Sequence, residues 1–245
     1  MALRNQGRFS ITICAEHGKL TYTRTVLMPK TKSDSKKLFE LEHKKSIVPL
    51  DCALGIDKTP FKMTLGFISK ASKACILANS YEDAVNDVFV ECNVKISAAE
   101  LERVTDYVGA LAFNIQKEEA ITAMLPESLK VDERRRRKRE NDILYLMTDG
   151  AMLHYRDKPN AGDGWGECKS ALCFHSRDIK YYKRKTDGEQ AHKIMKMDHI
   201  GFIGSADDFL PHFLALAQRN ECKVCSEVVI IIDGALWQFN RLKKY

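Results

Sequence analysis

Apolar and polar positions alternate near the N-terminus, and their spacing then changes twice along the chain. Every second residue is apolar from Phe9 to Ile13, which predicts the first strand of a hairpin over residues 9–27. Residues 30–47 are rich in Lys, Ser and Asp and have little periodicity, which is typical of a linker or loop. Residues 1–48 are therefore expected to form a β-hairpin and a polar linker.

Helical spacing dominates residues 49–130, where apolar residues recur every three to four positions. One helix is predicted at about 61–76, a second begins with Ser80 as its N-cap, and a third begins at the capping box Ser97–Glu100. The second and third helices suit a helix-turn-helix that reads DNA. Two antiparallel helices of a small bundle fit the same spacing, so both interpretations stay open.

A basic segment at residues 131–142 follows the helical region. It contains six consecutive cations: Arg134, Arg135, Arg136, Arg137, Lys138 and Arg139. Such a run can contact the DNA backbone, with an affinity that falls as salt rises. A solvated connector between two domains is the alternative, and the sequence favours neither.

Strand-like spacing returns in residues 143–245. The predicted elements are strands at 143–149, 167–174 and 179–183, a helix at 207–217 and a strand at 228–232. A second prediction for the third strand is that it continues past the turn at Gly188 towards Gly201. The order β-β-β-α-β indicates an α/β unit.

The first and last of these strands each run into Asp-Gly-Ala, at Asp149 and Asp233. A buried strand would bring its terminal carboxylate to the edge of a sheet, where two carboxylates can share divalent ions. Asp-Gly is also a common hairpin turn signal. That alternative is stronger for Asp149, because residues 151–155 suit a returning strand. The continuously apolar residues 230–232 instead predict an interior strand before Asp233.

Other candidate chemistry is weaker. Glu167 could add a metal ligand and Lys169 a phosphate contact, whereas the alternative is an exposed charge pair beside a strand-anchoring Trp165. Cys222 and Cys225 form the single CxxC. Without a second CxxC or an HxxxH, reduced and partly buried thiols are favoured over a zinc or redox site. His154, His175, His192, His199 and His212 show no metal-ligand spacing and are expected to be structural or exposed.

Composition narrows the class of protein only slightly. Hydrophobic residues make up 44% of the 245 positions and charged residues 29%, as in ordinary globular proteins. The net charge of +6 permits nucleic acid as a partner without establishing it. No apolar run reaches the length of a membrane span, and the N-terminus lacks a signal-peptide core. A cytoplasmic protein without membrane association is expected.

Three motifs in order carry a family resemblance. Asp149-Gly-Ala, then Trp165-x-Glu167-x-Lys169, then a strand into Asp233-Gly-Ala-x-Trp resemble bacterial insertion-sequence DDE transposases of the Lre/Kra type, which are distantly Mutator-like. Upstream segments also resemble that family's pre-catalytic region. These segments are Glu16–Gly18 with Arg24, Val48–Gly55, Ser80-Tyr81 with Ala84, and Ile96-Ser97.

The resemblance implies an RNase H-like catalytic fold that cleaves and transfers DNA strands with Mg²⁺ or Mn²⁺ in a two-metal site. It also implies DNA as partner, at the terminal inverted repeats of a mobile element. Asp149 would be the first metal-binding acid and Asp233 the second. The chain departs from the pattern at Gly166, where the family usually carries Arg. The third acid would lie on a helix beyond Asp233, so the chain is expected to be truncated at its C-terminus.

The sequence thus predicts an α+β protein with an N-terminal β-hairpin and helical, helix-turn-helix-like region, followed by a partial RNase H-like α/β domain. Its expected parts are 1–48, 49–130, a basic linker at 131–142, and a catalytic domain at 143–245. The expected function is that of a transposase or transposase-derived protein, incomplete in this chain, for which a homo-oligomer is an option. The alternatives are a non-catalytic DNA-binding or regulatory remnant and a complete small nuclease.

Overall fold

The computed structural model describes residues 2–42, 45–130, 135, 139, 141–154, 165–234 and 238. The fold is α+β, as predicted: a hairpin and helices come first and a mixed sheet follows. The chain divides into two compact units, Met1–Ala112 and Phe113–Tyr245. Among the described residues, no helix is both long enough and apolar enough to cross a membrane.

The first unit opens with the predicted hairpin, which is confirmed and is longer than expected. Strands β1 (Leu3–Ala15) and β2 (Gly18–Pro29) pair antiparallel. Ile11 and Ile13 point to the same side of β1 and are buried together with Ile56. The alternation seen in the sequence therefore marks the side of the hairpin that packs against the rest of the unit.

The predicted linker at 30–47 is wrong over most of its length, because helix α1 (Lys32–Glu42) occupies it. The Thr31 hydroxyl accepts a hydrogen bond from the backbone N–H of Asp34, as an N-cap does. Leu38 of this helix is buried, at 1% exposure. One cap and one buried leucine stabilise a helix whose other positions are mostly polar and whose Phe39 is exposed, a pattern that periodicity alone does not reveal.

A short helix α2 (Pro49–Ala53) precedes the three helices that the sequence predicted. These are α3 (Leu65–Leu77), α4 (Tyr81–Cys92) and α5 (Ala98–Ala123). The Ser80 and Ser97 hydroxyls accept hydrogen bonds from backbone N–H groups three residues later, so both predicted caps are confirmed. The dividing point of the two units lies within α5.

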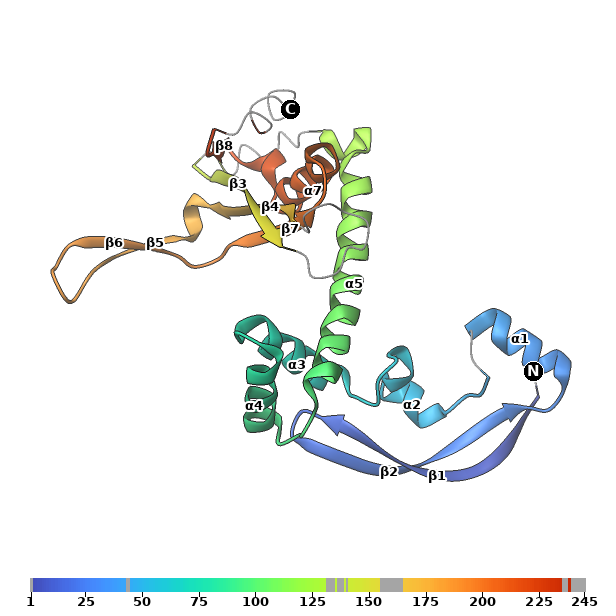
Figure 1. Cartoon of the computed structure of the whole chain (residues 1–245). Coiled ribbons are helices and arrows are strands. Elements are labelled where there is room, and N and C mark those ends of the chain that lie inside the picture. Colours follow the sequence, from blue (N-terminus) through green and yellow to red (C-terminus); the bar gives the residue numbers. More distant parts are fainter. Residues whose placement is uncertain are drawn as a thin grey trace. The chain divides into compact units, whose positions relative to one another are not determined.

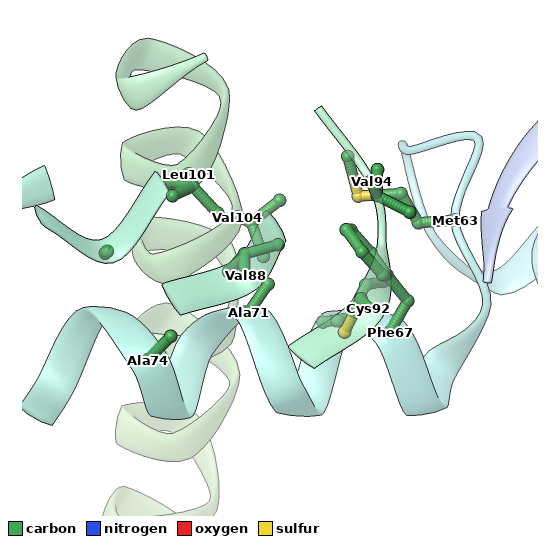
Figure 2. Packing of buried hydrophobic residues seen from close by; sticks show 11 residues of the cluster. Met63, Phe67, Ala71, Ala74, Val88, Cys92, Val94, Leu101 and Val104 are labelled. Carbon is green, nitrogen blue, oxygen red and sulfur yellow. The ribbon is translucent and has the colours of Figure 1, made fainter. Parts of the chain in front are cut away.

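Helices α3 and α4 and the start of α5 enclose an apolar core (Figure 2). Phe67 of α3, Val88 of α4 and Leu101 of α5 are all buried in it. The turn between α4 and α5 contributes Val94 to the same core. A turn packed in this way fixes the two helices against each other.

The second unit is built on a four-stranded sheet, whose strands lie in the order β7-β4-β3-β8. Strands β3 (Ile143–His154), β4 (Trp165–His175) and β7 (Asp198–Ile203) pair antiparallel, and β8 (Glu227–Ile232) pairs parallel with β3. Helix α7 (Ala206–Arg219) connects β7 to β8. The predicted order β-β-β-α-β is therefore confirmed for this sheet.

The third strand of the sheet is not the predicted 179–183 segment. That segment is β5 (Ile179–Lys183), which pairs with β6 (Gln190–Ile194) as a separate hairpin. In Figure 1 this orange hairpin leads away from the sheet. The sheet takes β7 instead, because β7 carries the buried residues Ile200 and Phe202 while β5 is largely exposed.

One face of the sheet is covered by α7. Leu144, Leu146 and Thr148 of β3 point to this face and are buried, whereas Tyr145 and Met147 between them are only partly buried. Strand β8 is the edge strand of the described sheet, and Val228, Ile230 and Ile231 are each about two-fifths exposed (39%, 43% and 40%). The predicted interior position of this apolar strand is therefore wrong.

Candidate functional site

Asp149 lies within β3, on the face of the sheet opposite α7. It pairs with Ser170 of β4, and its neighbour Gly150 pairs with Lys169, so the chain runs straight through Asp-Gly as strand. The hairpin-turn alternative for this dipeptide is therefore wrong. The Asp149 carboxylate is exposed and accepts a hydrogen bond of 2.7 Å from the Gly150 N–H.

Asp233 follows the last residue of β8. The parallel ladder between β3 and β8 ends with Thr148 opposite Ile232, so the next residues in register are Asp149 and Asp233. Neighbouring strands are about 4.8 Å apart. Two carboxylates that follow this register on the same face lie close enough for one ion or a pair of ions to contact both.

Both aspartates line one cavity of about 470 Å³ on the open face of the sheet. Its other polar side chains include those of Ser170 and His199, and apolar side chains such as Met147 form most of its wall. The sequence interpretation missed Ser170 and His199 as site residues. Strand pairing brings them there, since Ser170 lies opposite Asp149 and Leu172 lies opposite His199.

Glu167 and Lys169 lie on the other face of the same strands. Lys169 pairs with Gly150, one residue after Asp149, and side chains alternate between the two faces of a strand. Lys169 is 2% exposed, and its Nζ donates to Glu167 Oε2 at 2.6 Å and to the Gly204 carbonyl at 2.7 Å. A Cβ on Gly150 would come within 2.8 Å of Glu167 Oε1, so glycine makes room for this ion pair.

Two cations of the basic run, Arg135 and Arg139, fall within the described residues, and both form ion pairs with Glu221. The hydrogen bond from Arg139 is the main reason why the pKa of Glu221 is lowered. The other four, Arg134, Arg136, Arg137 and Lys138, lie outside the described residues, as do Ala235 and Trp237 of the second motif. Arg135 and Arg139 therefore form their ion pairs within the second unit.

A second cluster lies at the opposite end of β3. Asp142, His175 and Cys225 are all buried there, and Asp142 Oδ2 is 3.1 Å from His175 Nδ1. Cys225 Sγ is 3.8 Å from the same nitrogen and 4.0 Å from Asp142 Oδ2. Burial, followed by the charge of Asp142, raises the pKa of the Cys225 thiol to about 11. Helical or CxxC spacing could not reveal this cluster, because its members come from three distant segments.

The two groups of residues differ in the ions they suit. Asp149 and Asp233 offer only carboxylate oxygens, which Mg²⁺ and Mn²⁺ prefer. Asp142, His175 and Cys225 offer one oxygen, one nitrogen and one sulfur.

A comparison with protein-family models finds no match to the chain, and a comparison with curated proteins finds none either.

Proposed function

We propose that this chain is a transposase or transposase-derived protein whose second unit cleaves and transfers DNA strands with the help of Mg²⁺ or Mn²⁺. One observation carries the proposal. Asp149 of β3 and Asp233, which follows β8, come directly after the last paired residues of two adjacent parallel strands, and both line the same cavity. Carboxylates on the first and fourth strands of a β-β-β-α-β unit fit the RNase H-like fold that the family resemblance implies.

The residues fit the metal by their donor chemistry. The two carboxylates would hold the divalent ions, which, when bound, would activate the attacking hydroxyl and stabilise the leaving oxygen. Ser170 and His199 border the same cavity and offer a hydroxyl and an imidazole to a phosphate or sugar. The apolar wall around Met147 would exclude bulk water from one side of the site.

DNA as the substrate is supported by the hairpin of β5 and β6. Residues 179–197 contain six Lys or Arg and two acidic residues, a net charge of +4 out of +6 for the whole chain. Lys180 and Lys193 lie directly opposite each other in this hairpin and are both exposed. Like charges in cross-strand positions destabilise a sheet. A phosphate bound between them would remove that cost, and exposed Tyr181 and Tyr182 supply aromatic faces.

A second candidate function is DNA binding without cleavage. The described lining of the cavity contains two carboxylates, whereas DDE-type sites use three acids. This observation favours a regulatory role in which the chain occupies DNA ends and does not cut them. The two candidates share the basic hairpin and differ in metal-dependent activity.

The first experiment measures Mn²⁺ binding and nicking of a supercoiled plasmid by the purified chain. We expect Asp149→Asn and Asp233→Asn each to weaken Mn²⁺ binding by about tenfold or more, because each removes one of two charged oxygen ligands. Asp87→Asn, on the exposed side of α4, is the matched control. Nicking that both site variants abolish supports the transposase. Mn²⁺ binding without nicking supports the second candidate, and binding that neither variant weakens contradicts the metal site.

The second experiment tests the basic hairpin with a labelled duplex oligonucleotide. Lys180→Ala combined with Lys193→Ala should reduce affinity and lower the slope of log affinity against log salt by about 2, one for each lost phosphate contact. Lys36→Ala combined with Lys37→Ala removes the same charge from exposed positions on α1 and is the control. Equal losses in the two double variants would mean that net charge alone, and not this hairpin, binds the DNA.

A further inference from the structure

Asp142, His175 and Cys225 are brought together by the strand pairing itself. Asp142 immediately precedes β3, and His175 at the end of β4 lies opposite Leu144. Cys225 comes two residues before β8, whose first residue lies opposite Ile143. Three separate segments thus meet at the end of the sheet that is remote from Asp149 and Asp233.

The spacing of the three ligand atoms matches one face of a tetrahedron around zinc. Zn–N and Zn–O bonds of about 2.1 Å and Zn–S bonds of about 2.3 Å would place nitrogen about 3.4 Å from oxygen, and sulfur about 3.6 Å from either. The observed separations are 3.1 Å for nitrogen and oxygen, 3.8 Å for nitrogen and sulfur, and 4.0 Å for sulfur and oxygen. Each lies within about 0.4 Å of the ideal value.

The surroundings of Asp142 are those of a held ligand. Its Oδ1, next to the proposed ligand atom Oδ2, is buried and has no hydrogen-bond partner among the described residues, an arrangement that is costly unless a group bound at Oδ2 also reaches it. Its Oδ2 accepts a hydrogen bond of 2.5 Å from Arg177 Nη1. The backbone carbonyl of Asp142 accepts two more from Ser226, so the residue is fixed in place. Hydrogen bonds that orient a ligating carboxylate are common around metal ions.

Cys222, the other cysteine of the CxxC, takes no part in this cluster. Its side chain packs against the core beneath α7 and lines a separate apolar cavity with Leu210 and Phe213. The described residues therefore offer three ligands, which would leave the fourth tetrahedral position to a water molecule. A zinc site here would depend on Cys225 and be indifferent to Cys222.

From this geometry we propose that Asp142, His175 and Cys225 bind a zinc ion that ties the starts of β3 and β8 to the end of β4. Structural zinc sites usually have four protein ligands, but these three are all buried. The role we assign to the ion is therefore to crosslink three segments of the second unit, apart from the carboxylate pair at the other end of β3. Zinc suits the set because it accepts nitrogen, sulfur and oxygen ligands together in tetrahedral geometry.

The test uses Co²⁺ as the probe, on the whole chain without a histidine tag and under reducing conditions. We expect a thiolate-to-cobalt charge-transfer band that saturates at one equivalent and disappears when Zn²⁺ is added. Cys225→Ser should lose the band, while Cys222→Ser and Asp149→Asn should keep it. Loss of the band in Cys222→Ser, or the absence of a band in the folded wild-type chain, would overturn the proposal.

A second measurement covers the case in which Cys225→Ser fails to fold. The melting temperature of the wild-type chain should rise when zinc is added and return to its starting value when a chelator removes the metal. His175→Gln should retain a thiolate band but bind Co²⁺ about tenfold or more weakly, since one of three ligands is lost. A melting temperature that zinc leaves unchanged would contradict a structural ion at this position.

Discussion

The two ends of strand β3 carry acidic residues in opposite environments. At the start, Asp142 is buried beside His175 and Cys225 and is held by Arg177 and Ser226. Seven residues later, Asp149 is exposed on the open face of the sheet and lines a cavity together with Asp233. The strand is the same, but Asp142 is buried among charged and hydrogen-bonded partners, whereas Asp149 faces a second carboxylate across an open cavity.

This difference separates a structural role from a chemical one. A buried carboxylate with fixed partners contributes to stability and has no access to a large substrate. An exposed carboxylate next to another contributes little to stability, or even reduces it by repulsion, yet is free to bind an ion and a substrate. We therefore expect substitutions at the start of β3 to affect folding and those at Asp149 to affect binding.

The largest expected effect comes from making the same change at both ends. Asp142→Asn should lower the free energy of unfolding by about 2 kcal/mol, because it weakens a buried hydrogen bond to charged Arg177. Asp149→Asn should change it by less than about 0.5 kcal/mol, as exposed substitutions usually do. Chemical denaturation in the presence of a chelator measures both without any contribution from bound metal. Equal changes in the free energy of unfolding for Asp142→Asn and Asp149→Asn would contradict the distinction between the two ends of β3.

A smaller effect is expected at Lys169, which lies on the covered face beside Gly150. Lys169→Met should lower the free energy of unfolding by about 1 kcal/mol, because Gly204 loses a hydrogen bond while Glu167 is exposed enough to be hydrated. DNA affinity should stay the same, since the lysine is buried away from the open face. Chemical denaturation measures the change in the free energy of unfolding, and a binding titration measures the DNA affinity. A marked loss of DNA affinity would place Lys169 in the functional site.

The smallest expected effect is a dependence of stability on pH that arises in the covered core. Burial lowers the pKa of His212, whose ring lies next to those of Phe113 and Phe202. The unfolded chain then binds more protons, so stability is complete above the unfolded pKa of about 6.5 and falls as the pH drops below it.

The control for this prediction is His212→Phe, which keeps an aromatic ring and cannot be protonated. It should reduce the loss of stability between neutral and mildly acidic pH, as measured by melting temperature across that range. Asp149→Asn should leave the loss unchanged. If Asp149→Asn reduces the loss of stability at acidic pH and His212→Phe does not, Asp149 rather than His212 accounts for the dependence of stability on pH.

Local signals explain which parts of the fold the sequence could predict. The caps at Ser80 and Ser97 and the apolar spacing of α3, α4, α5 and α7 depend on residues within a few positions of each other. Helix α1 was missed because most of its positions are polar and its apolar residues are confined to its second half. The third sheet strand was misplaced because β5 and β7 have similar β propensity, and only tertiary packing chooses between them.

The site was partly predictable for the same reason. Asp149 and Asp233 each end an apolar run with the same tripeptide, so the sequence could pair them, and the parallel ladder brings them into register. The cluster at the other end joins Asp142 to Cys225 across 83 positions. No local pattern links those residues. The sequence also could not show that Lys169 points to the covered face, since that depends on strand register.

Anomalous diffraction from crystals grown with Mn²⁺ and Zn²⁺, recorded on both sides of each metal edge, would test the distinction between the two ends most directly. We expect manganese within about 2.2 Å of carboxylate oxygens of both Asp149 and Asp233. Zinc should lie about 2.3 Å from Cys225 Sγ. Manganese bound elsewhere, or absent from the cavity while the two aspartates remain in register, would contradict the proposed function.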